Sequence, residues 1–395
     1  MVNEPLAAPP LWMISLLAGL GLFASAVHMP SIPAMASEFG VTPQPIQLTV
    51  SIYLASMAIF ALLVGPMSDR FGRRRIGLTM IFVFLLGSIG ALLATNVTML
   101  LVARLVQGIG ASGGLVLSRT MVRDAFSDRN AAKASAQIAT AVAIAPMLGP
   151  LFGGYIHDAF GWRANFLVVA ILAFGLWVIA IRRFGETLPI TKRYAGNALA
   201  MMTNYYALIR MRKFMMYATP VICGSVGLFT FQTEAPVLLI QFMHVQPADF
   251  GMFAAMPAVG FMIGTFTSAR LALHISESRL IVGGCSLFVV AGVLIIVLAL
   301  GFLPSPWLIS VPMLLFGAGN GLVTPSATMG SLSAAPFLFG SAAALISGLR
   351  MGAGSLGSVA ITEVPPGSAI PLGCVMFVTG LIALVSWKRL GRWKA

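Results

Sequence analysis

Twelve apolar stretches, each long enough to cross the hydrocarbon layer of a membrane, constrain this chain more than any other feature. A helix needs roughly 20 mainly apolar residues to span ~30 Å of hydrocarbon. Lipid offers the backbone no hydrogen-bond partner, so segments of this length are expected to be helical. The stretches are 11–35, 47–67, 76–95, 98–121, 134–156, 163–183, 214–242, 249–271, 280–302, 306–329, 339–361 and 370–388. The sequence therefore predicts an all-α membrane protein with 12 transmembrane helices.

The segment 184–213, between the sixth and seventh stretches, is the longest polar and basic part of the chain. It divides the stretches into two groups of six. A weak repeat relates the groups, because the run Arg104–Gly110 resembles Leu314–Gly321 about 200 residues later, and parallel repeats of this kind place a substrate site between the halves. We therefore predict a six-helix bundle in 1–183, a cytoplasmic linker in 184–213 and a second six-helix bundle in 214–395.

Charged residues make up 9% of the chain, too few to cover a water-exposed surface, since soluble proteins carry about 25%. We place the N-terminus inside and let successive helices alternate in direction. All but three of the 24 Lys and Arg residues then fall on the cytoplasmic side, and Arg119 belongs to this cytoplasmic set. The exceptions are Arg163 outside and Arg104 and Arg350 within the membrane. Basic residues collect in cytoplasmic loops, so we predict cytoplasmic termini in a bacterial inner membrane. The net charge of +13 is then a topology signal, and no nucleic-acid partner is expected.

The sequence lacks the constellations typical of enzymes and metalloproteins. Its three cysteines and four histidines are scattered, and no nucleophile–base pairing, phosphate-binding loop or metal-ligand cluster is evident. The N-terminus lacks the basic region of a cleavable signal, so the first apolar stretch is expected to remain as a membrane helix. We predict a protein that is not an enzyme and holds neither a metal nor a cofactor.

The strongest motif is the run GPMSDRFGRRR at 65–75, in the predicted cytoplasmic turn between the second and third helices. Gly65 permits close helix contact, and Gly72 is a turn residue. Asp69 is the only acid in this basic turn, so it can pair with an arginine or with a helix N-terminus. The motif predicts a conformational latch; the alternative is a tight, positively charged turn without that role. The residues of the predicted latch in this turn are Gly65, Asp69, Arg70, Gly72 and Arg73.

This motif resembles the loop motif of the major facilitator superfamily residue by residue, and the resemblance extends over essentially the whole chain. The segments PSIP at 30–33, RD at 123–124 and GWR at 161–163 resemble the drug:proton antiporter branch, and its bicyclomycin–chloramphenicol (Bcr/CflA) subfamily in particular. The resemblance implies a secondary transporter, which we expect to act as a monomer. It also implies that the loop acid, here Asp69, pairs with Arg123 beside Asp124 and with the backbone near Gly340.

Arg104 lies within the predicted fourth helix, where a buried arginine is costly unless it is paired or hydrated. The spacing puts Arg104 and Gln107 on one helix face, and Gly108 permits a close helix contact there. In the resembled family this arginine is implicated in proton coupling. The alternative is that Arg104 only donates to exposed backbone carbonyls of a neighbouring helix.

The fifth stretch combines two prolines with three glycines. The prolines bend the helix, and the glycines leave a smooth groove for another helix. In the resembled family a G-P-x-x-G-G pattern here marks antiporters rather than symporters, which favours export; the alternative is the ordinary Gly and Pro content of membrane helices. The residues of this predicted antiporter motif are Pro146, Gly149, Pro150, Gly153 and Gly154.

Glu234 is the one clear acid in the membrane spans of the second half, two residues before Pro236. It lies about 30 Å along the seventh helix when counted from Phe214, near the outer side. A poorly hydrated cleft favours the protonated form of a carboxyl group, which suits a proton carrier. The alternative is a water-exposed residue at the mouth of the cavity without a transport role.

The first helix departs from the resembled subfamily, in which an acid often precedes the proline segment. Alignment on Pro30 and Pro33 puts Ala26 at that position and His28 where an aromatic residue is usual. His28 can titrate near neutral pH, so it is a second candidate for proton coupling. The alternative is that His28 packs at a helix end.

Arg350 lies about 15 Å into the eleventh helix, near the midplane. The spans contain two embedded arginines, Arg104 and Arg350, and one clear acid. This balance of charges predicts a neutral to positive cavity, so we expect neutral or anionic substrates to be favoured over cations. The alternative is a pair between Glu234 and Arg350 that opens during the cycle. The resemblance implies that helices 1, 4, 7 and 10 line the cavity. The predicted substrate contacts are Tyr53, Gln107, Phe229, Phe231, Gln232, Asn320, Thr324 and Arg350.

These patterns together predict a proton-coupled antiporter that exports small amphipathic compounds by alternating access. Its partners would be a small-molecule substrate, protons and the lipid bilayer, with the proton gradient as its energy source. One alternative is proton-coupled uptake of a small metabolite on the same fold. The other is a lipid-handling or non-transporting membrane protein.

Overall fold

The computed structural model describes residues 9–126, 128–189, 198–272, 274–301, 305–365 and 367–391, and it is all-helical over this part of the chain. The described residues contain 12 spans that are long and apolar enough to cross a membrane. This number confirms the sequence prediction. Most of the spans are longer than the apolar stretches, because polar residues at their ends remain helical.

The first half consists of α1 (Leu11–Ala26), η1 (Met29–Ser31), α2 (Ile32–Glu38), α3 (Pro43–Phe71), α4 (Arg73–Leu92), α5 (Val97–Ala125), α6 (Asp128–Phe160) and α7 (Arg163–Arg183). The short α8 (Ala198–Arg210) follows. The second half consists of α9 (Arg212–Pro236), η3 (Val237–Phe242), α10 (Pro247–Ala254), α11 (Met256–Leu271), α12 (Glu277–Gly301), α13 (Pro306–Ala334), η4 (Pro336–Leu338), α14 (Phe339–Thr362) and α15 (Ile370–Gly391).

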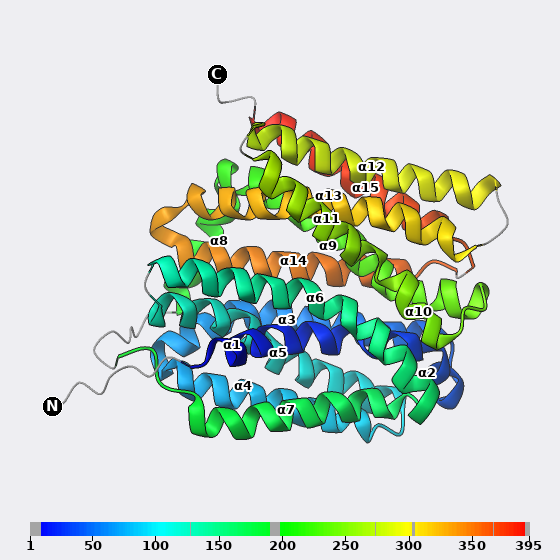
Figure 1. Ribbon diagram of the computed structural model, residues 1–395, viewed down its shortest axis with the longest axis horizontal. Coiled ribbons are helices and arrows are strands. Elements are labelled where there is room, and N and C mark those ends of the chain that lie inside the picture. Colours follow the sequence, from blue (N-terminus) through cyan, green and yellow to red (C-terminus); the bar gives the residue numbers. More distant parts are fainter. Residues whose placement is uncertain are drawn as a thin grey trace.

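The spans run side by side along the long axis of the molecule (Figure 1). The start of α1, the end of α15 and the whole of α8 lie at one end, which we call the linker end. The opposite end, with α2 and α10, is the distal end. The helices α1–α7 form one bundle and α9–α15 a second, and the bundles meet where α3 packs on α14 and α6 packs on α10.

The first bundle has one apolar core, whereas the second has a larger and a smaller buried cluster. Four residues interlock the bundles. Phe229 and Met351 of the second half belong to the core of the first bundle. Ala26 and Met29 of the first half belong to the larger cluster of the second. The separate cores agree with the predicted pair of six-helix bundles; the exact division into 1–183, 184–213 and 214–395 stays a prediction.

Proline accounts for the helix breaks within three spans, and each of these breaks lies towards the distal end. Pro30 is the second residue of the 3₁₀ turn η1, and Pro33 is the second residue of α2. Pro236 ends α9, where the chain widens into the π-helical turn η3, and Pro257 is the second residue of α11. Proline lacks a backbone N–H and clashes with the preceding turn, so the backbone must change direction at these points.

Glycines at equivalent positions of α5 and α13 support the internal repeat. Gly108 and Gly110 of α5 face α3 and α4, and Gly317 and Gly319 of α13 face α11 and α12 in the same order. At each of these positions, an added methyl group would lie within 2.5 Å of a backbone atom of the facing helix. Glycine is therefore required for the close contact of the central helix in both bundles.

The contact at Gly110 predicts opposite effects for the same substitution at two glycines. A methyl group at Gly110 would lie 2.3 Å from the Phe84 nitrogen, whereas nothing lies within 4 Å of one at Gly175. We expect Gly110→Ala to destabilise the protein by about 1–3 kcal/mol through overpacking. Gly175→Ala should be neutral or stabilising by up to about 1 kcal/mol, because alanine favours helix. Unfolding of the purified variants in detergent measures both; equal stability of Gly110→Ala and wild type would contradict the contact.

Candidate functional site

A polar seam joins the two bundles near the distal end. The Gln47 side-chain amide donates to the Thr233 carbonyl (2.9 Å) and to the Glu234 carboxylate (3.2 Å). One helix turn further in, the Ser51 hydroxyl donates to Ser358 Oγ (2.9 Å), which also hydrogen-bonds the Thr233 hydroxyl. All five side chains are buried. The seam therefore holds α3 of the first bundle against α9 and α14 of the second.

Glu234 belongs to this seam and not to a water-exposed mouth. Its side chain is 6% exposed, and it lies about 12 Å inside the end of its span at Phe242. Its side-chain partner is the neutral Gln47, and none of the ion pairs in the described part of the chain includes it. Burying a carboxyl group in such a place costs little when it is protonated and much more when it is charged.

Arg104 is fully buried and ties three helices of the first bundle together. Its Nη1 donates to the Ala24 carbonyl (3.2 Å) and to the Gln107 side-chain oxygen, and its Nε donates to the Thr49 carbonyl (3.4 Å). The guanidinium also lies over the Tyr53 ring, 4.2 Å from its centroid. These are the carbonyl contacts of the scaffolding alternative. A role of Arg104 in proton coupling stays a prediction.

His28 packs at the break between α1 and η1. Its side chain is fully buried, its ring centroid lies 5.7 Å from that of Phe166, and its Nε2 lies 3.3 Å from Thr49 Oγ1. This position fits a histidine that fills the space at a helix end, and a titrating role for it stays a prediction.

The predicted substrate contacts fall into a buried set and a half-buried set. The buried set is Tyr53, Gln107, Phe229, Phe231, Gln232 and Asn320. Some of these side chains are already engaged: Gln107 donates to Ser88 Oγ (2.8 Å), and the Asn320 oxygen accepts from Thr324 (2.8 Å). Thr324 and Arg350 are half-buried. In this conformation only these two expose appreciable surface, and substrate contact at the other positions stays a prediction.

Arg350 contacts a serine of α9 and not Glu234. Its Nε donates to Ser225 Oγ (3.1 Å), nine residues and about 13 Å along α9 from Glu234. The alternative pair between Glu234 and Arg350 is therefore not formed in this structure.

Arg119 is a residue of the bundle boundary that the sequence analysis did not single out. It was assigned to a cytoplasmic loop, but α5 continues to Ala125, so Arg119 lies inside the span. Its Nη1 donates to Ser347 Oγ of α14 (2.9 Å), across the boundary between the bundles. The apolar residues Met121 and Val122 beyond it were the available signal that the helix continues.

The proline–glycine motif of α6 faces both bundles. A methyl group at Gly153 would lie 1.9 Å from the Val27 carbonyl oxygen in the first bundle, and one at Gly154 would lie 1.9 Å from the Pro247 carbonyl oxygen of α10 in the second. Gly149 approaches Ala26 of α1 in the same way. Pro146 and Pro150 lie inside the continuous helix α6. The motif therefore forms close contacts across the bundle boundary, and its link with antiport stays a prediction.

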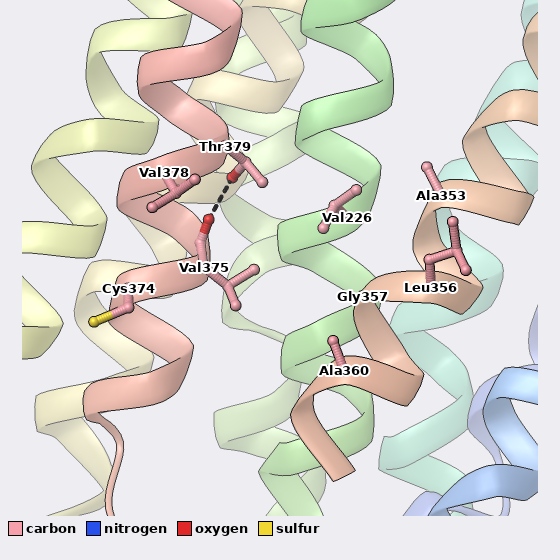
Figure 2. A pocket seen from close by; sticks show the side chains of 9 residues that line it. All are labelled: Val226, Ala353, Leu356, Gly357, Ala360, Cys374, Val375, Val378 and Thr379. Atoms are coloured by element: carbon pink, nitrogen blue, oxygen red, sulfur yellow. Dashed lines mark hydrogen bonds between the residues drawn. The ribbon is translucent and has the colours of Figure 1, made fainter. Parts of the chain in front are cut away.

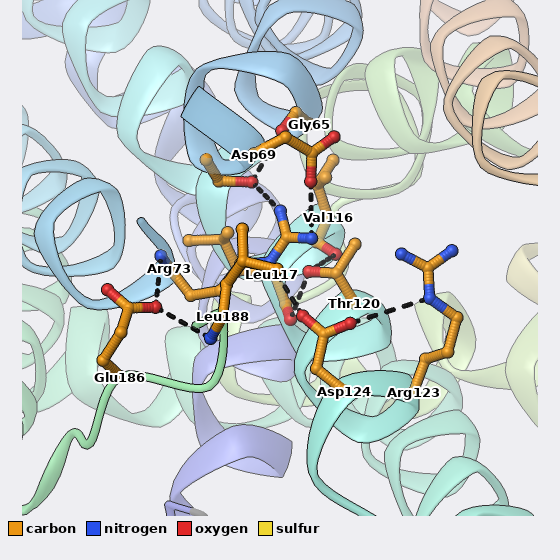
Figure 3. A network of polar contacts seen from close by, with 11 residues as sticks. Gly65, Asp69, Arg73, Val116, Leu117, Thr120, Arg123, Asp124, Glu186 and Leu188 are labelled. Atoms are coloured by element: carbon orange, nitrogen blue, oxygen red, sulfur yellow. Dashed lines mark hydrogen bonds and ion pairs between the residues drawn. The ribbon is translucent and has the colours of Figure 1, made fainter. Parts of the chain in front are cut away.

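Arg73 is the centre of a polar network that joins α3, α4 and α5 (Figure 3). Its side chain is 1% exposed and pairs with Asp69 (2.5 Å) and Asp124 (2.9 Å). Its backbone N–H donates to Glu186, in the segment after α7 (2.9 Å). Gly72, between α3 and α4, has φ 94°, a left-handed conformation that favours glycine.

The Asp69–Arg123 pair implied by the resemblance is not formed here. Asp69 pairs with Arg73 instead, whereas Arg123 is exposed and its Nε lies 3.8 Å from Asp124 (Figure 3). Arg123 nevertheless faces the second bundle, since a methyl group at Gly340, near the start of α14, would lie 3.9 Å from its Nη1.

Two other latch residues lie at the surface. Arg70 is exposed, with its guanidinium 5.2 Å from the Phe71 ring centroid. The close helix contact expected at Gly65 is wrong, because a methyl group there would meet nothing within 4 Å. A latching role for the network stays a prediction.

A groove of about 480 Å³ opens on the outer side of the second bundle, between α9, α14 and α15 (Figure 2). It is lined by Val226, Ala353, Leu356, Gly357, Ala360, Cys374, Val375, Val378 and Thr379. This almost entirely apolar surface suits the acyl chains of surrounding lipid. It lies away from the boundary between the bundles, where the buried and half-buried polar groups are.

Comparisons with known proteins identify relatives over nearly the whole chain. Residues 11–359 match the Major Facilitator Superfamily. Multidrug resistance protein D of Escherichia coli is 28% identical over 378 residues, which cover 95% of this chain and 94% of the relative. A bicyclomycin resistance protein homolog of Haemophilus influenzae is 26% identical over 381 residues, covering 94% and 93%. The xylose transporter XylE from E. coli, in a partially occluded inward open conformation, has the same fold, with a TM-score of 0.72 at 16% identity and 98% coverage of both chains.

The network around Arg73 predicts a loss of stability when its centre is removed. Arg73→Gln would leave the mostly buried Asp124 with only the exposed Arg123, 3.8 Å away, as an ionic partner, so we expect a cost of about 3 kcal/mol. Arg75→Gln removes a charge from the same turn, but at an exposed side chain, and should change stability by less than about 0.5 kcal/mol. Unfolding of both variants in one detergent makes the comparison; equal losses would contradict the assigned role of Arg73.

Proposed function

The chain belongs to the Major Facilitator Superfamily, and from this premise we propose that it is a proton-coupled antiporter that exports small amphipathic compounds by alternating access. The family consists of transporters, so the protein is not an enzyme. The names of the relatives, a multidrug resistance protein and a bicyclomycin resistance protein homolog, support drug-type efflux. The observation that carries the proposed mechanism is the contact between Glu234 and Gln47, because it puts a titratable group on the boundary between the bundles.

We assign the linker end to the cytoplasm of a bacterial inner membrane. The start of α1 and the end of α15 lie at that end of the molecule (Figure 1). The basic turn around Arg73, the end of α7 at Arg182 and Arg183, and the end of α15 at Lys388 and Arg389 also lie there. Basic residues are retained on the cytoplasmic side. The distal end then faces the periplasm, and the seam around Glu234 is a gate on that side.

Protonation of Glu234 has a defined direction of effect. The closed seam buries the carboxyl group, and one amide donor from Gln47 does not replace the hydration of a charged carboxylate. The protonated form therefore favours the closed periplasmic gate, and loss of the proton favours its opening, which hydrates the carboxylate. Release of the proton to the cytoplasm and binding of another from the periplasm would then carry one proton inward as a substrate leaves.

The charges of the cavity support neutral or anionic substrates. Arg119 reaches across the boundary to α14, the helix that also contains Arg350, and the ion pairs of the described residues include neither arginine. A cationic substrate would be repelled from these side chains. We further propose that the protein acts as a monomer and that the proton gradient, without a cofactor, supplies the energy.

The coupling role of Glu234 is tested by Glu234→Gln, which resembles the protonated form. We expect transport driven by a pH gradient in everted vesicles to fall about tenfold or more, because the variant cannot exchange a proton. Glu363→Gln is the matched control, since Glu363 is an exposed acid at the same end of the molecule, and it should transport like the wild type. Undiminished gradient-driven transport by Glu234→Gln would remove Glu234 from the mechanism.

The assigned orientation predicts which surface positions an impermeant reagent reaches. Ser276 and Ser368 are exposed at the linker and distal ends, respectively. In a background with Cys374 replaced by serine, a membrane-impermeant maleimide on intact spheroplasts should label Ser368→Cys and not Ser276→Cys. Permeabilised spheroplasts should label both. The reverse pattern in intact spheroplasts would contradict the orientation.

A further inference from the structure

Arg119 and Arg350 come from different bundles and meet on the same face of α14. Arg119 extends from α5 to Ser347 Oγ, and Arg350 lies three residues after Ser347 on α14. Residues three apart on a helix are neighbours on its surface. Both side chains therefore approach the same turn of α14, and like charges that lie near each other repel.

Each arginine is held by one neutral serine. Ser347 donates its own hydroxyl proton to the Ala343 carbonyl (2.8 Å), and Ser225 donates to the Val221 carbonyl (3.0 Å), so both serine oxygens accept from an arginine. A guanidinium group has five N–H donors. One donor of each arginine is used in these contacts, and the described residues supply no carboxylate to either. Most donors of both groups therefore remain available.

Both side chains keep accessible surface although they lie within membrane spans. Arg119 is exposed and Arg350 is half-buried. A charged side chain within a span is expected to face the bundle interior or a water-filled cavity rather than lipid. Two positive charges in such surroundings are costly without a counterion, and a planar anion can accept paired hydrogen bonds from a guanidinium.

We infer that Arg119 and Arg350 form a two-arginine clamp for the carboxylate, or a similar planar anionic group, of an amphipathic substrate. Phe229, the next aromatic residue of α9 beyond Ser225, packs against α14 at Gly354, so the apolar part of the substrate would extend from the clamp towards the seam. This inference deepens the proposed export function and rests on it for its physiological meaning.

The clamp also explains how a substrate would promote transport. Arg119 belongs to the first bundle and Arg350 to the second, so their repulsion opposes closure of the linker end. An anion between them neutralises the repulsion and contacts both bundles, so it binds more tightly when they approach. A ligand shifts a conformational equilibrium only through such a difference in affinity.

The test is equilibrium binding of a matched pair of radiolabelled compounds to purified full-length protein in detergent, without a pH gradient. The pair is naphthalene-2-carboxylate and naphthalene-2-carboxamide, which differ in charge and hardly in shape. We expect saturable binding of the carboxylate and affinity for the carboxamide at least about tenfold lower. Arg119→Gln and Arg350→Gln should each weaken carboxylate binding about tenfold or more. Arg279→Gln, at an exposed arginine of α12, should bind like the wild type.

The conservative variants Arg119→Lys and Arg350→Lys separate charge from folding. They keep the positive charge, so they should bind the carboxylate better than the glutamine variants. Equal binding of the two compounds, no saturable binding of the carboxylate by the wild type, or unchanged binding by both glutamine variants would overturn the clamp. Because no gradient is applied, this binding result is independent of export. If the protein binds the carboxylate through the clamp but shows no proton-driven transport, the inference stands and the proposed function is refuted.

Discussion

Hydrocarbon provides no hydrogen-bond partner, and every polar group within the spans must find one inside the protein. This constraint explains why the buried polar residues of the first bundle form a connected set. Arg104 uses backbone carbonyls of α1 and α3 and the amide of Gln107, and Gln107 in turn donates to Ser88. A charged side chain without these partners would be costly to bury. The network therefore makes the first bundle a unit that can move without exposing its charge to lipid.

The contacts between the bundles are more polar than those within each bundle. Within a bundle, glycines such as Gly110 and Gly317 bring backbones to a separation that leaves no room for a side chain. Between bundles, Gly154 makes one such close contact with Pro247. Other contacts across the boundary are made by small hydroxyls, one amide and one carboxyl group near the distal end, and by Arg119 with Ser347 towards the linker end. Hydrogen bonds between such groups can be exchanged for water at little net cost. Close packing inside bundles and exchangeable polar contacts across the boundary suit rigid-body rocking.

The two polar groups of the boundary have complementary chemistry. The seam near the distal end contains an acid with a neutral partner, whose protonation changes the cost of burial. The arginines carry a fixed positive charge, and the free-energy cost of keeping this charge inside the protein falls when an anion binds. A proton and a substrate could thus act on opposite ends of one boundary, and each would influence the other through the position of the bundles rather than through direct contact. Reciprocal coupling of this type needs two sites and a shared two-state element.

The sequence by itself determined the number of spans, the two bundles and the basic linker end, because these depend on the hydropathy of continuous segments and on the position of lysines and arginines. It also singled out Glu234 and Arg350, since a charged residue within an apolar stretch stands out. It could not determine their partners: Gln47 and Ser225 are ordinary polar residues distant in sequence from Glu234 and Arg350, and only the packing of α3, α9 and α14 brings each pair together. Packing also decides that Asp69 pairs with Arg73 and not with Arg123, whereas the assignment of Arg119 to a loop was an error in the position of a helix end. Segment composition is a local property, whereas a hydrogen bond between helices depends on their rotation and relative position, which the tertiary structure alone decides.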